Sequence, residues 1–297
     1  MEIRGGFSQS FPKKSYELSL LTDTLAANDQ DMALLGMRAD NKWNLQAMYN
    51  DQLRLRLKTA NELWQDMHQV YYKAQEPNAK NGIALAYTEV FLNGQYQGIY
   101  ALTERVDRKQ LKLKKYTTSM QGELYKGAAW EAGTAFTTLP AYDNHSQLWA
   151  GFEYKEPSQQ TEWKALHDFV GFVENSSDAD FYSQYKTRFN LENAMDYFLF
   201  LNLMRATDNT GKNLYIAKYK PNEPYYYVPW DLDGVLGNDW QGLNTNVTND
   251  ILTNGMYQRL FKYAPGGEFW AALTNPVGCT TQHRAHPGCP AGQAEPQ

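Results

Sequence analysis

The stretch that decides the fold is the apolar segment Leu191–Met204, the loop Asp208-Asn209-Thr210-Gly211-Lys212-Asn213, the segment Leu214–Val228, and then Trp230-Asp231-Leu232-Asp233-Gly234. The apolar segment follows Asn190, a favoured N-cap residue, and therefore predicts a helix. Within residues 214–228, the turn Pro221-Asn222-Glu223-Pro224 separates two short runs rich in aromatic and β-branched residues, which predicts two strands. Such a hairpin folds the chain back and brings Asp208, Asn213 and Asp231 to one place.

These three side chains suit phosphoryl transfer. A protein kinase presents a helix, an Asp-x4-Asn loop, two strands and a second Asp in this order. Asp208 is then the acceptor of a hydroxyl proton, and Asn213 and Asp231 supply oxygen ligands for Mg²⁺. The alternative is that residues 208–211 form only a turn and that Asp231 only caps the next one, because Asp, Asn and Gly favour turns. Asp233 either reaches the same metal or caps Gly234.

Composition sets the broad class. The chain has 297 residues, 42% of them hydrophobic, with 21 Tyr and 8 Trp, which indicates a globular protein with a large core. The net charge of -5 gives no basic footprint, so nucleic acid is not expected as a partner. No apolar run is long enough to span a membrane. The start, residues 1–6, resembles the middle of a strand, so we expect a truncated N-terminus; location and oligomeric state are open on composition alone.

Periodicity predicts an α+β fold. Tyr16, Leu18 and Leu20 alternate with polar residues as in a strand, and a polar loop is expected from there to Trp43. The remaining predictions are a helix within residues 50–73, a hairpin from Tyr87 to Leu102 around Asn93-Gly94, a strand at Gly122–Lys126 and a helix from a Thr161 cap to Asn175. We expect one domain over residues 1–275, with a β-rich N-terminal lobe at about 1–130, an irregular boundary within 127–160 and a more helical C-terminal lobe at about 160–275.

The last residues differ from the rest. Residues 276–297 contain no aromatic side chain and are rich in Gly, Pro, Ala, His, Cys and Gln. Cys279, His283, His286 and Cys289 are zinc-ligand types, but their neighbours offer nothing to pack around a metal. We therefore expect a disordered or non-native tail.

The candidate nucleotide-binding residues lie in the β-rich part. Lys14 shares its strand face with Tyr16 and could reach the α- and β-phosphates, with Glu104 holding it in place. The alternative is that Lys14 and Glu104 are two solvated charges on unrelated strands. Arg4 and Lys126 are further phosphate candidates. The Ser- and Gly-rich turn at residues 5–10 could direct backbone N–H groups to a phosphate, although it has no Walker pattern.

The ordered motifs resemble the CotH kinase family, the spore-coat-protein-H-like atypical protein kinases. The matching pieces are Arg4-Gly5, residues 10–16, Glu89–Gly94, Gly98–Tyr100, Leu102–Val106, Gly122–Leu124, Asp208-Asn209, Lys212–Tyr215 and Pro229–Asp231. The resemblance implies a two-lobed kinase-like fold, binding of ATP with Mg²⁺, and phosphate transfer to Ser of coat, envelope or secreted proteins. It also favours a location in the spore coat or cell envelope, or secretion. The chain departs from the family at its start, at its tail, and at Gly6, where the family usually has Asn.

Two other functions stay open at this point. A non-catalytic binding module of the same fold would have no need of three oxygen ligands around one site. A phosphatase of the haloacid-dehalogenase type would use Asp231 as nucleophile and Asp233 as acid within the motif Asp231-Leu232-Asp233-Gly234-Val235. That fold normally begins at this motif, whereas here the motif lies near the end of the chain.

Overall fold

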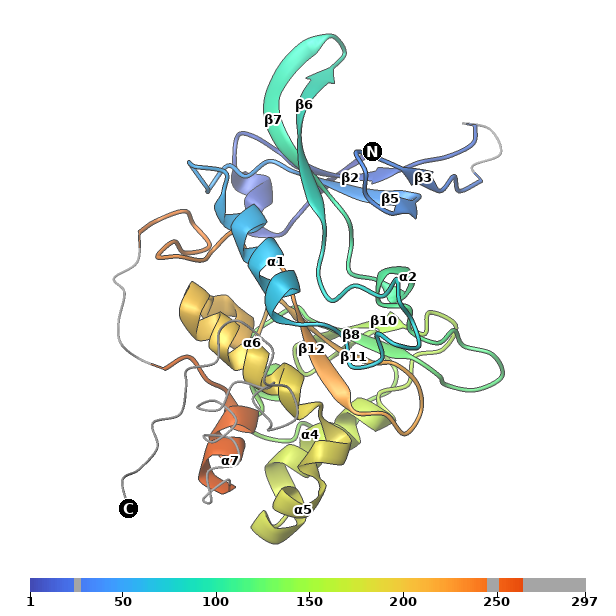
Figure 1. Ribbon diagram of the computed structural model, residues 1–297, viewed down its shortest axis with the longest axis vertical. Coiled ribbons are helices and arrows are strands. Elements are labelled where there is room, and N and C mark those ends of the chain that lie inside the picture. The colour runs from blue at the N-terminus through green and yellow to red at the C-terminus, as the bar shows by residue number, and fades with distance from the viewer. Residues whose placement is uncertain (24–27, 245–250, 264–297) are drawn as a thin grey trace, which may run out of the picture.

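The computed structural model describes residues 1–23, 28–244 and 251–263. The expected tail at residues 276–297, with its four Cys and His residues, lies outside the described residues. Two five-stranded antiparallel sheets and a set of helices form the molecule, so the expected α+β class is confirmed. In Figure 1 the first sheet lies above the second, and the short helix α2 (Arg108–Leu111) lies between them.

The first sheet has the strand order β1-β2-β5-β7-β6. Its strands are β1 (Glu2–Arg4), β2 (Ser15–Ser19), β5 (Lys42–Gln46), β6 (Leu85–Leu92) and β7 (Gln95–Thr103). The predicted hairpin is β6–β7, and Asn93 and Gly94 at its turn both have positive φ, as a tight hairpin turn requires. Its tip extends beyond the rest of the sheet (Figure 1).

The prediction of a polar loop before Trp43 was wrong in part. It contains a two-stranded ribbon, β3 (Met32–Ala33) with β4 (Ala39–Asp40), and β5 starts at Lys42. In β5, Trp43 and Leu45 are buried in a core while Asn44 and Gln46 line a cavity. Polar residues on the cavity face make the strand look like a loop, although the alternation is a strand signal.

The second sheet has the strand order β12-β11-β8-β10-β9. Its strands are β8 (Glu123–Gly127), β9 (Leu148–Trp149), β10 (Phe152–Glu156), β11 (Leu214–Lys218) and β12 (Tyr225–Pro229). The segment expected to be irregular therefore holds two strands and the one-turn helix α3 (Ala132–Ala135). Because β8 pairs with β10 and β11, the chain passes from the first sheet to the second between residues 103 and 123, before the boundary expected from the sequence.

The longer helices are α1 (Arg56–Met67), α4 (Lys164–Asn175), α5 (Asp178–Arg188), α6 (Leu191–Met204) and α7 (Gly255–Tyr263). The prediction for α6 is confirmed, and the Asn190 side chain accepts a hydrogen bond from the backbone N–H of Asn193. The helix expected from a Thr161 cap begins at Lys164, after Trp163, whose buried ring fixes the start. None of the helices in the described ranges has the length and apolar character of a membrane span.

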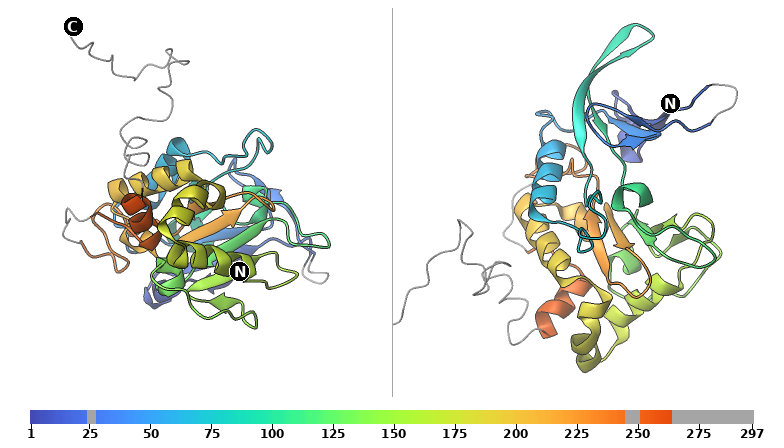
Figure 2. Two further views of the ribbon diagram at one scale, coloured as in Figure 1. Left: turned by 90° about the horizontal axis from the view of Figure 1, so that it is seen from below. Right: turned by 45° about the vertical axis from the view of Figure 1, so that its right-hand side comes forward.

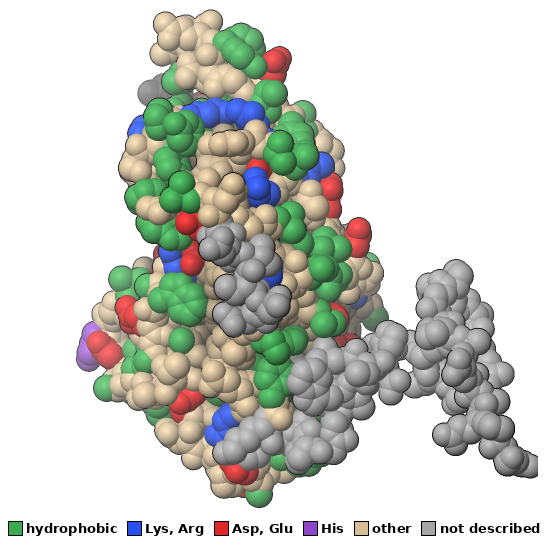
Figure 3. All heavy atoms as spheres, turned by 90° about the vertical axis from the view of Figure 1, so that its left-hand side faces the viewer, with side chains coloured by type: hydrophobic (Ala, Val, Ile, Leu, Met, Phe, Trp, Pro, Cys, Tyr) green, Lys and Arg blue, Asp and Glu red, His purple; other side chains and the backbone are tan. Residues whose placement is uncertain are grey.

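The largest core lies between the second sheet and its helices. The helix α6 covers β12, and α4, α5 and α7 gather near it at the same end of the molecule (Figures 1 and 2). Trp64 of α1 packs edge to face on Tyr197 of α6 and tilts against Phe200. These aromatic contacts attach α1, which follows the first sheet in sequence, to the helical part, and each aromatic pair adds about 1 kcal/mol beyond its buried area. The side of the molecule facing left in Figure 1 carries several hydrophobic patches among polar side chains (Figure 3).

Candidate active site

The loop that carries Asp208 starts where α6 ends. Arg205 caps α6 in the left-handed conformation, and the chain then forms one 3₁₀ turn, η2 (Thr207–Thr210). The backbone N–H of Lys212 donates to the carbonyl of Asp208 at 2.9 Å, which closes the next turn. Residues 208–211 are therefore a turn, as the alternative reading proposed, and this turn holds Asp208 half-buried at the edge of a cavity.

Asn209 holds this loop against the end of the hairpin. Its side chain is 1% exposed, and its amide nitrogen donates to the carbonyls of Asn213 at 2.5 Å and Trp230 at 2.8 Å. The hydroxyl of Tyr197 donates to the carbonyl of Asn209 at 2.7 Å. One side chain thus joins Asn213, just before β11, to Trp230, just before Asp231. Removing it would leave buried carbonyls unpaired, which costs about 1–3 kcal/mol.

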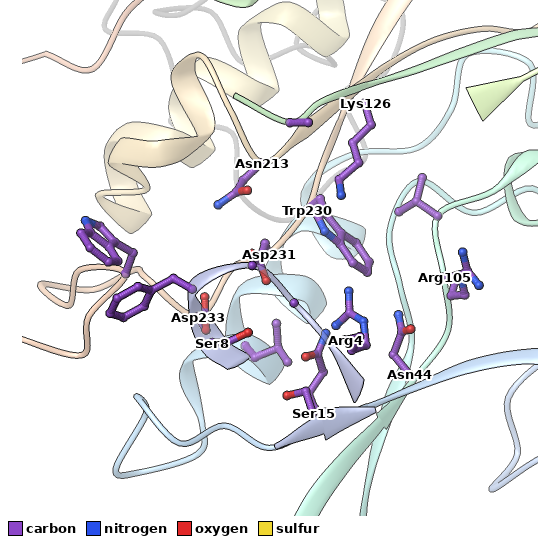
Figure 4. A pocket seen from close by; sticks show the side chains of 18 of the residues that line it. Arg4, Ser8, Ser15, Asn44, Arg105, Lys126, Asn213, Trp230, Asp231 and Asp233 are labelled. Atoms are coloured by element: carbon purple, nitrogen blue, oxygen red, sulfur yellow. The ribbon is translucent and has the colours of Figure 1, made fainter. Parts of the chain in front are cut away.

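The hairpin brings the three predicted residues together. Asn213 and Asp231 flank its two ends, because Leu214 pairs with Pro229 and the N–H of Trp230 donates to the carbonyl of Asn213 at 3.0 Å. The amide of Asn213 lies 3.5 Å from the Asp208 carboxylate. All three line one cavity, and Figure 4 shows Asn213 and Asp231 beside each other within it.

The backbone at both strand ends is in an uncommon conformation. Asn213 has a φ of 52° and Asp231 a φ of 58°, in the left-handed region that non-glycine residues seldom adopt. Asn and Asp are the residues that tolerate it best. Strained conformations of this kind are concentrated at functional sites. The sequence therefore uses tolerant residue types where the chain must turn sharply into the cavity.

Asp233 lies in the same cavity, and its hydrogen-bond partner comes from a distant part of the chain. Its Oδ2 accepts a hydrogen bond at 2.8 Å from the amide of Asn50, which comes from the connection between β5 and α1. Burial, and then the neighbouring charge of Asp231, raise the pKa of Asp233 to about 7. A bound cation would favour its ionised form, so Asp233 is available as a further metal ligand or metal-side acceptor.

The cavity has a volume of about 740 Å³ and lies between the two sheets. That volume is in the range of cofactor sites. Residues 5–8, which follow β1 and enter the 3₁₀ turn η1 (Phe7–Ser10), line it on the first-sheet side. The ring of Phe7 meets the ring of Trp240 edge to face, with centroids 4.5 Å apart. This contact joins the glycine-rich turn to the segment that follows Asp233, so the two walls meet at one end.

Cationic side chains from both sheets line the cavity opposite the acids. Lys126 on β8 lies 4.0 Å from Glu153 on β10, which also binds Lys155. Burial lowers the pKa of Lys126, and the charge of Glu153 counteracts this in part. Arg4 lies over the ring of Trp230 at 5.7 Å from the centroid, and Figure 4 shows it in the cavity with Lys126. Arg4 and Lys126 are therefore placed where an anionic ligand would meet them.

The expected pair of Lys14 and Glu104 is wrong. The ammonium of Lys14 donates to the carbonyls of Gln9 at 2.7 Å and Phe11 at 2.6 Å, and Lys14 does not line the cavity. Successive strand residues face opposite sides of a sheet, and the face of Tyr16 and Leu18 packs on a core. The face that meets the cavity is that of Lys13, Ser15 and Glu17.

Glu104 is a structural carboxylate. It is 1% exposed and accepts hydrogen bonds from Lys80 at 2.8 Å, from the N–H of Ala84 at 3.0 Å and from Gln110 at 3.2 Å. Burial alone would raise the pKa of Glu104, but the hydrogen bonds from Lys80 and Ala84 outweigh burial and lower it. Glu104 therefore joins the end of β7 to the segments around residues 80 and 110, and does not reach the cavity.

Trp130, from the segment expected to be irregular, stands beside Asp208. It is 50% exposed, and its Nε1 lies 3.5 Å from the Asp208 carboxylate. Its ring covers Gly211, where an added Cβ would lie 2.4 Å from the ring. Gly211 is thus required for this close approach. An exposed aromatic side chain next to Asp208 can form a wall for an incoming acceptor.

The cavity residues that sequence reasoning did not predict differ in the local signal that they carry. Glu153 and Lys155 alternate with Phe152 and Tyr154, which is a strand pattern inside the segment expected to be irregular. Asn50 has no such pattern, because its partner Asp233 is 183 residues away in the chain. Asn209 stands inside the motif itself, but its role depends on carbonyls that only the folded hairpin brings near.

The donor set for a metal is limited. Among the described residues no cluster of at least three His, Cys, Asp or Glu side chains is arranged to hold a metal ion. Asp231 and Asn213, with Asp233 nearby, offer two carboxylates and one amide oxygen. Mg²⁺ commonly binds through one or two carboxylates and completes its shell with water and substrate phosphates, so the residues present fit a nucleotide-bound Mg²⁺.

A family model described as CotH kinase protein matches residues 1–271, most of the chain. The chain belongs to the CotH kinase family. No curated protein matches it. Family membership agrees with the site at the ends of β11 and β12. The phosphatase alternative receives no support, because β12, the strand before Asp231, is the edge strand of an antiparallel sheet.

Proposed function

We propose that this protein is an atypical protein kinase that transfers the γ-phosphate of ATP to serine side chains, with Mg²⁺ as the metal. The observation that carries the proposal is the meeting of Asp208, Asn213 and Asp231 in one cavity between two sheets. Family membership supports a kinase, and the site geometry adds a reason for each residue. The two sheets with their helices would form the two lobes of a kinase-like fold.

Asp208 is proposed as the base. Its carboxylate lies at the cavity edge beside Trp130, where a serine hydroxyl can approach from solvent. The serine Oγ forms a bond to the γ-phosphorus while the bond from that phosphorus to the β–γ bridging oxygen breaks. The hydroxyl proton passes to Asp208, and ADP leaves. The turn η2 and the contact with Asn213 orient the carboxylate.

Asn213 and Asp231 are proposed as metal ligands, with Asp233 beside them. When bound, Mg²⁺ neutralises charge on the phosphates during transfer. Lys126 and Arg4 are proposed to contact phosphate oxygens, and the Lys126–Glu153–Lys155 group takes the place expected for Lys14 and Glu104. Charge-assisted contacts of this kind are among the strongest hydrogen bonds in proteins.

The test combines binding and transfer. ATP with Mg²⁺ should raise the free energy of unfolding by about 2.7 kcal/mol at 100 times its dissociation constant, and ATP without Mg²⁺ should raise it less. Labelled γ-phosphate should then appear on a serine-containing protein but not on the same protein with its serines replaced by alanine. Stabilisation without any transfer would favour the non-catalytic binding module. If ATP with Mg²⁺ does not stabilise the protein and no phosphate is transferred, the kinase assignment is rejected.

A further inference from the structure

A second groove lies beside α2, separate from the candidate active site. Its volume is also about 740 Å³. Asp107 lines the active-site cavity, and the next residue, Arg108, lines this groove, so the start of α2 divides the two. In Figure 1, α2 lies at the level where the two sheets meet. The groove is therefore next to the catalytic cavity but has its own lining.

The groove is strongly basic. Seven Lys or Arg side chains line it, against two carboxylates, Asp31 and Glu76, although the chain as a whole has a net charge of -5. None of the lining residues is aromatic. On the face drawn in Figure 3, by comparison, Lys and Arg side chains are scattered. A concentration of positive charge on an acidic protein is a feature that attracts an anionic partner.

Four of the seven cations already have acidic partners. Lys80 binds Glu104 at 2.8 Å, and Lys114 binds Glu76 at 2.8 Å. Arg38 binds Asp40 at 2.6 Å and Asp107 at 2.9 Å, and Lys109 binds Asp40 at 3.2 Å and Asp31 at 3.3 Å. These pairs form the floor and sides of the groove and leave little positive charge for a ligand.

The side chains of the other three cations, Arg108, Lys112 and Lys115, make no hydrogen bond or close ion pair within the described ranges. The charges of Glu156 and Glu76 act on Arg108 and Lys112 only from a distance. Lys112 and Lys115 are exposed. Lys112 caps α2 in the left-handed conformation, which directs the chain away from the helix axis. These three side chains supply the charge that the groove offers to a partner.

The backbone that carries them is fixed. Leu111 and Leu113 are buried on either side of Lys112. The N–H of Leu113 donates to the carbonyl of Arg108 at 3.1 Å, and that of Lys114 donates to the carbonyl of Tyr219 at 3.0 Å. The cations therefore stand on a preorganised segment, and a ligand would bind with little loss of backbone entropy.

We propose that this groove binds an extended anionic segment of the protein substrate and so holds its serine near Asp208. This proposal rests on the proposed kinase function and names the substrate class. The anionic groups are either carboxylates or phosphoserines formed earlier by the same enzyme. Because the groove adjoins the active-site cavity, one polypeptide can occupy both, and the second contact then forms at high effective concentration.

A polypeptide fits better than a nucleic acid. A single-stranded nucleic acid is usually bound by aromatic side chains that stack on its bases, and the groove lining has none. Asp31 and Glu76 would repel a regularly spaced phosphate backbone. An extended peptide can place its acidic side chains at Arg108, Lys112 and Lys115 and neutral ones at the carboxylates.

The experiment measures peptide binding by fluorescence anisotropy, at low salt and without nucleotide. The probes are three labelled peptides that alternate glycine with glutamate, phosphoserine or glutamine, together with a labelled oligothymidylate. The variant is Lys112→Glu/Lys115→Glu. The control is Lys58→Glu/Lys164→Glu, which makes the same change in net charge at two surface ion pairs on α1 and α4. Melting curves verify folding, and Lys112→Gln/Lys115→Gln serves if the charge reversal destabilises the chain.

The wild type should bind one or both anionic peptides and not the glutamine peptide. Lys112→Glu/Lys115→Glu should weaken binding at least about tenfold, whereas the control should bind like the wild type. Whichever of the glutamate and phosphoserine peptides binds with the higher affinity identifies the preferred anionic group. Equal weakening by both charge reversals, no binding of either anionic peptide, or preferential binding of oligothymidylate would each overturn the proposal.

A kinetic arm separates this proposal from the kinase assignment. Asp208→Ala should bind the anionic peptide as the wild type does, because the groove does not include Asp208. A serine peptide with an anionic flank should have a lower KM than one with a neutral flank at similar kcat, and Lys112→Glu/Lys115→Glu should remove that difference. If the wild type binds the peptide but transfers no phosphate, the kinase assignment is rejected, whereas the proposal that the groove binds an anionic peptide still holds. Equal KM values for the two flanks would reject the docking role.

Discussion

The two sheets form opposite walls of one cavity, and they differ in how deeply their strands are buried. Every residue of β12 and nearly every residue of β11 is buried, whereas β6 and β1 of the first sheet are largely exposed. The second sheet packs through aromatic side chains such as Tyr227, which stacks on Tyr197 of α6 with ring centroids 4.6 Å apart. The first sheet has a smaller core and a polar face on the cavity. A buried sheet fixes catalytic atoms within narrow limits, and a half-exposed sheet leaves its side chains room to adjust to a ligand.

The largest expected effect concerns Asp208, the proposed base, on the side of the well-packed second sheet. Asp208→Ala should reduce phosphate transfer by roughly 10²–10⁴-fold while ATP·Mg²⁺ binding is kept, because only proton acceptance is lost. Single-turnover kinetics with calorimetry of nucleotide binding would measure both. If nucleotide binding is lost as well, Asp208 is a metal ligand; if transfer continues near the wild-type rate, the turn at residues 208–211 has no catalytic part.

The contrast in packing predicts a contrast in stability. Tyr227→Ala should lower the free energy of unfolding by about 3–5 kcal/mol, because Tyr227 is fully buried and leaves a cavity. Tyr96→Ala, on the exposed hairpin of the first sheet, should change it by no more than about 0.5 kcal/mol. Urea denaturation of both variants provides the comparison. Similar losses would mean that the two sheets are equally packed in solution.

Asp231, a proposed metal ligand, should have a smaller effect, seen in nucleotide binding. Asp231→Asn should weaken Mg²⁺-dependent nucleotide binding by roughly 100-fold, since it removes one carboxylate charge from the residues that would hold Mg²⁺. Calorimetry with and without magnesium gives the measurement. An unchanged affinity in magnesium would remove Asp231 from the metal site. The neighbouring Asp239→Asn, outside the cavity lining, serves as a control for loss of one charge.

The smallest expected effect concerns Lys13, on the first-sheet side of the cavity. Burial, together with the nearby charge of Arg54, lowers the pKa of Lys13 to about 8. Lys13 lines the cavity and Lys14 does not. Deprotonation of Lys13 removes a positive charge, so nucleotide affinity should fall several-fold as the pH rises from 8 to about 9.5. The range above pH 8 is suitable because Asp233, with a pKa of about 7, is already ionised there.

Two substitutions make the pH measurement specific. Lys13→Gln should weaken nucleotide binding slightly and flatten its dependence on pH, whereas Lys14→Gln should retain the dependence of the wild type. Binding of ATP at a series of pH values, with magnesium held constant, would show the difference. An identical slope in wild type and Lys13→Gln would exclude Lys13 from the phosphate contacts.

The sequence by itself determined those features that depend on neighbouring residues. The helix α6, its Asn190 cap, the hairpin at Asn93-Gly94 and the strands β11 and β12 all follow from local periodicity, caps and turns. The meeting of Asp208, Asn213 and Asp231 follows too, because a hairpin returns the chain to its starting point. These signals are local, so a single sequence is enough to read them.

Only the tertiary structure decided which residues from distant parts of the chain face the candidate active site. The choice between Lys13 and Lys14 depends on which face of β2 packs on a core, and adjacent strand residues cannot be distinguished by residue type alone. Glu104 joins Lys80 because β7 ends beside that segment. Asp233 receives its hydrogen bond from Asn50, 183 residues away. Such pairings are set by the packing of the two sheets, and the energy that fixes them comes from burial of side chains scattered along the whole chain.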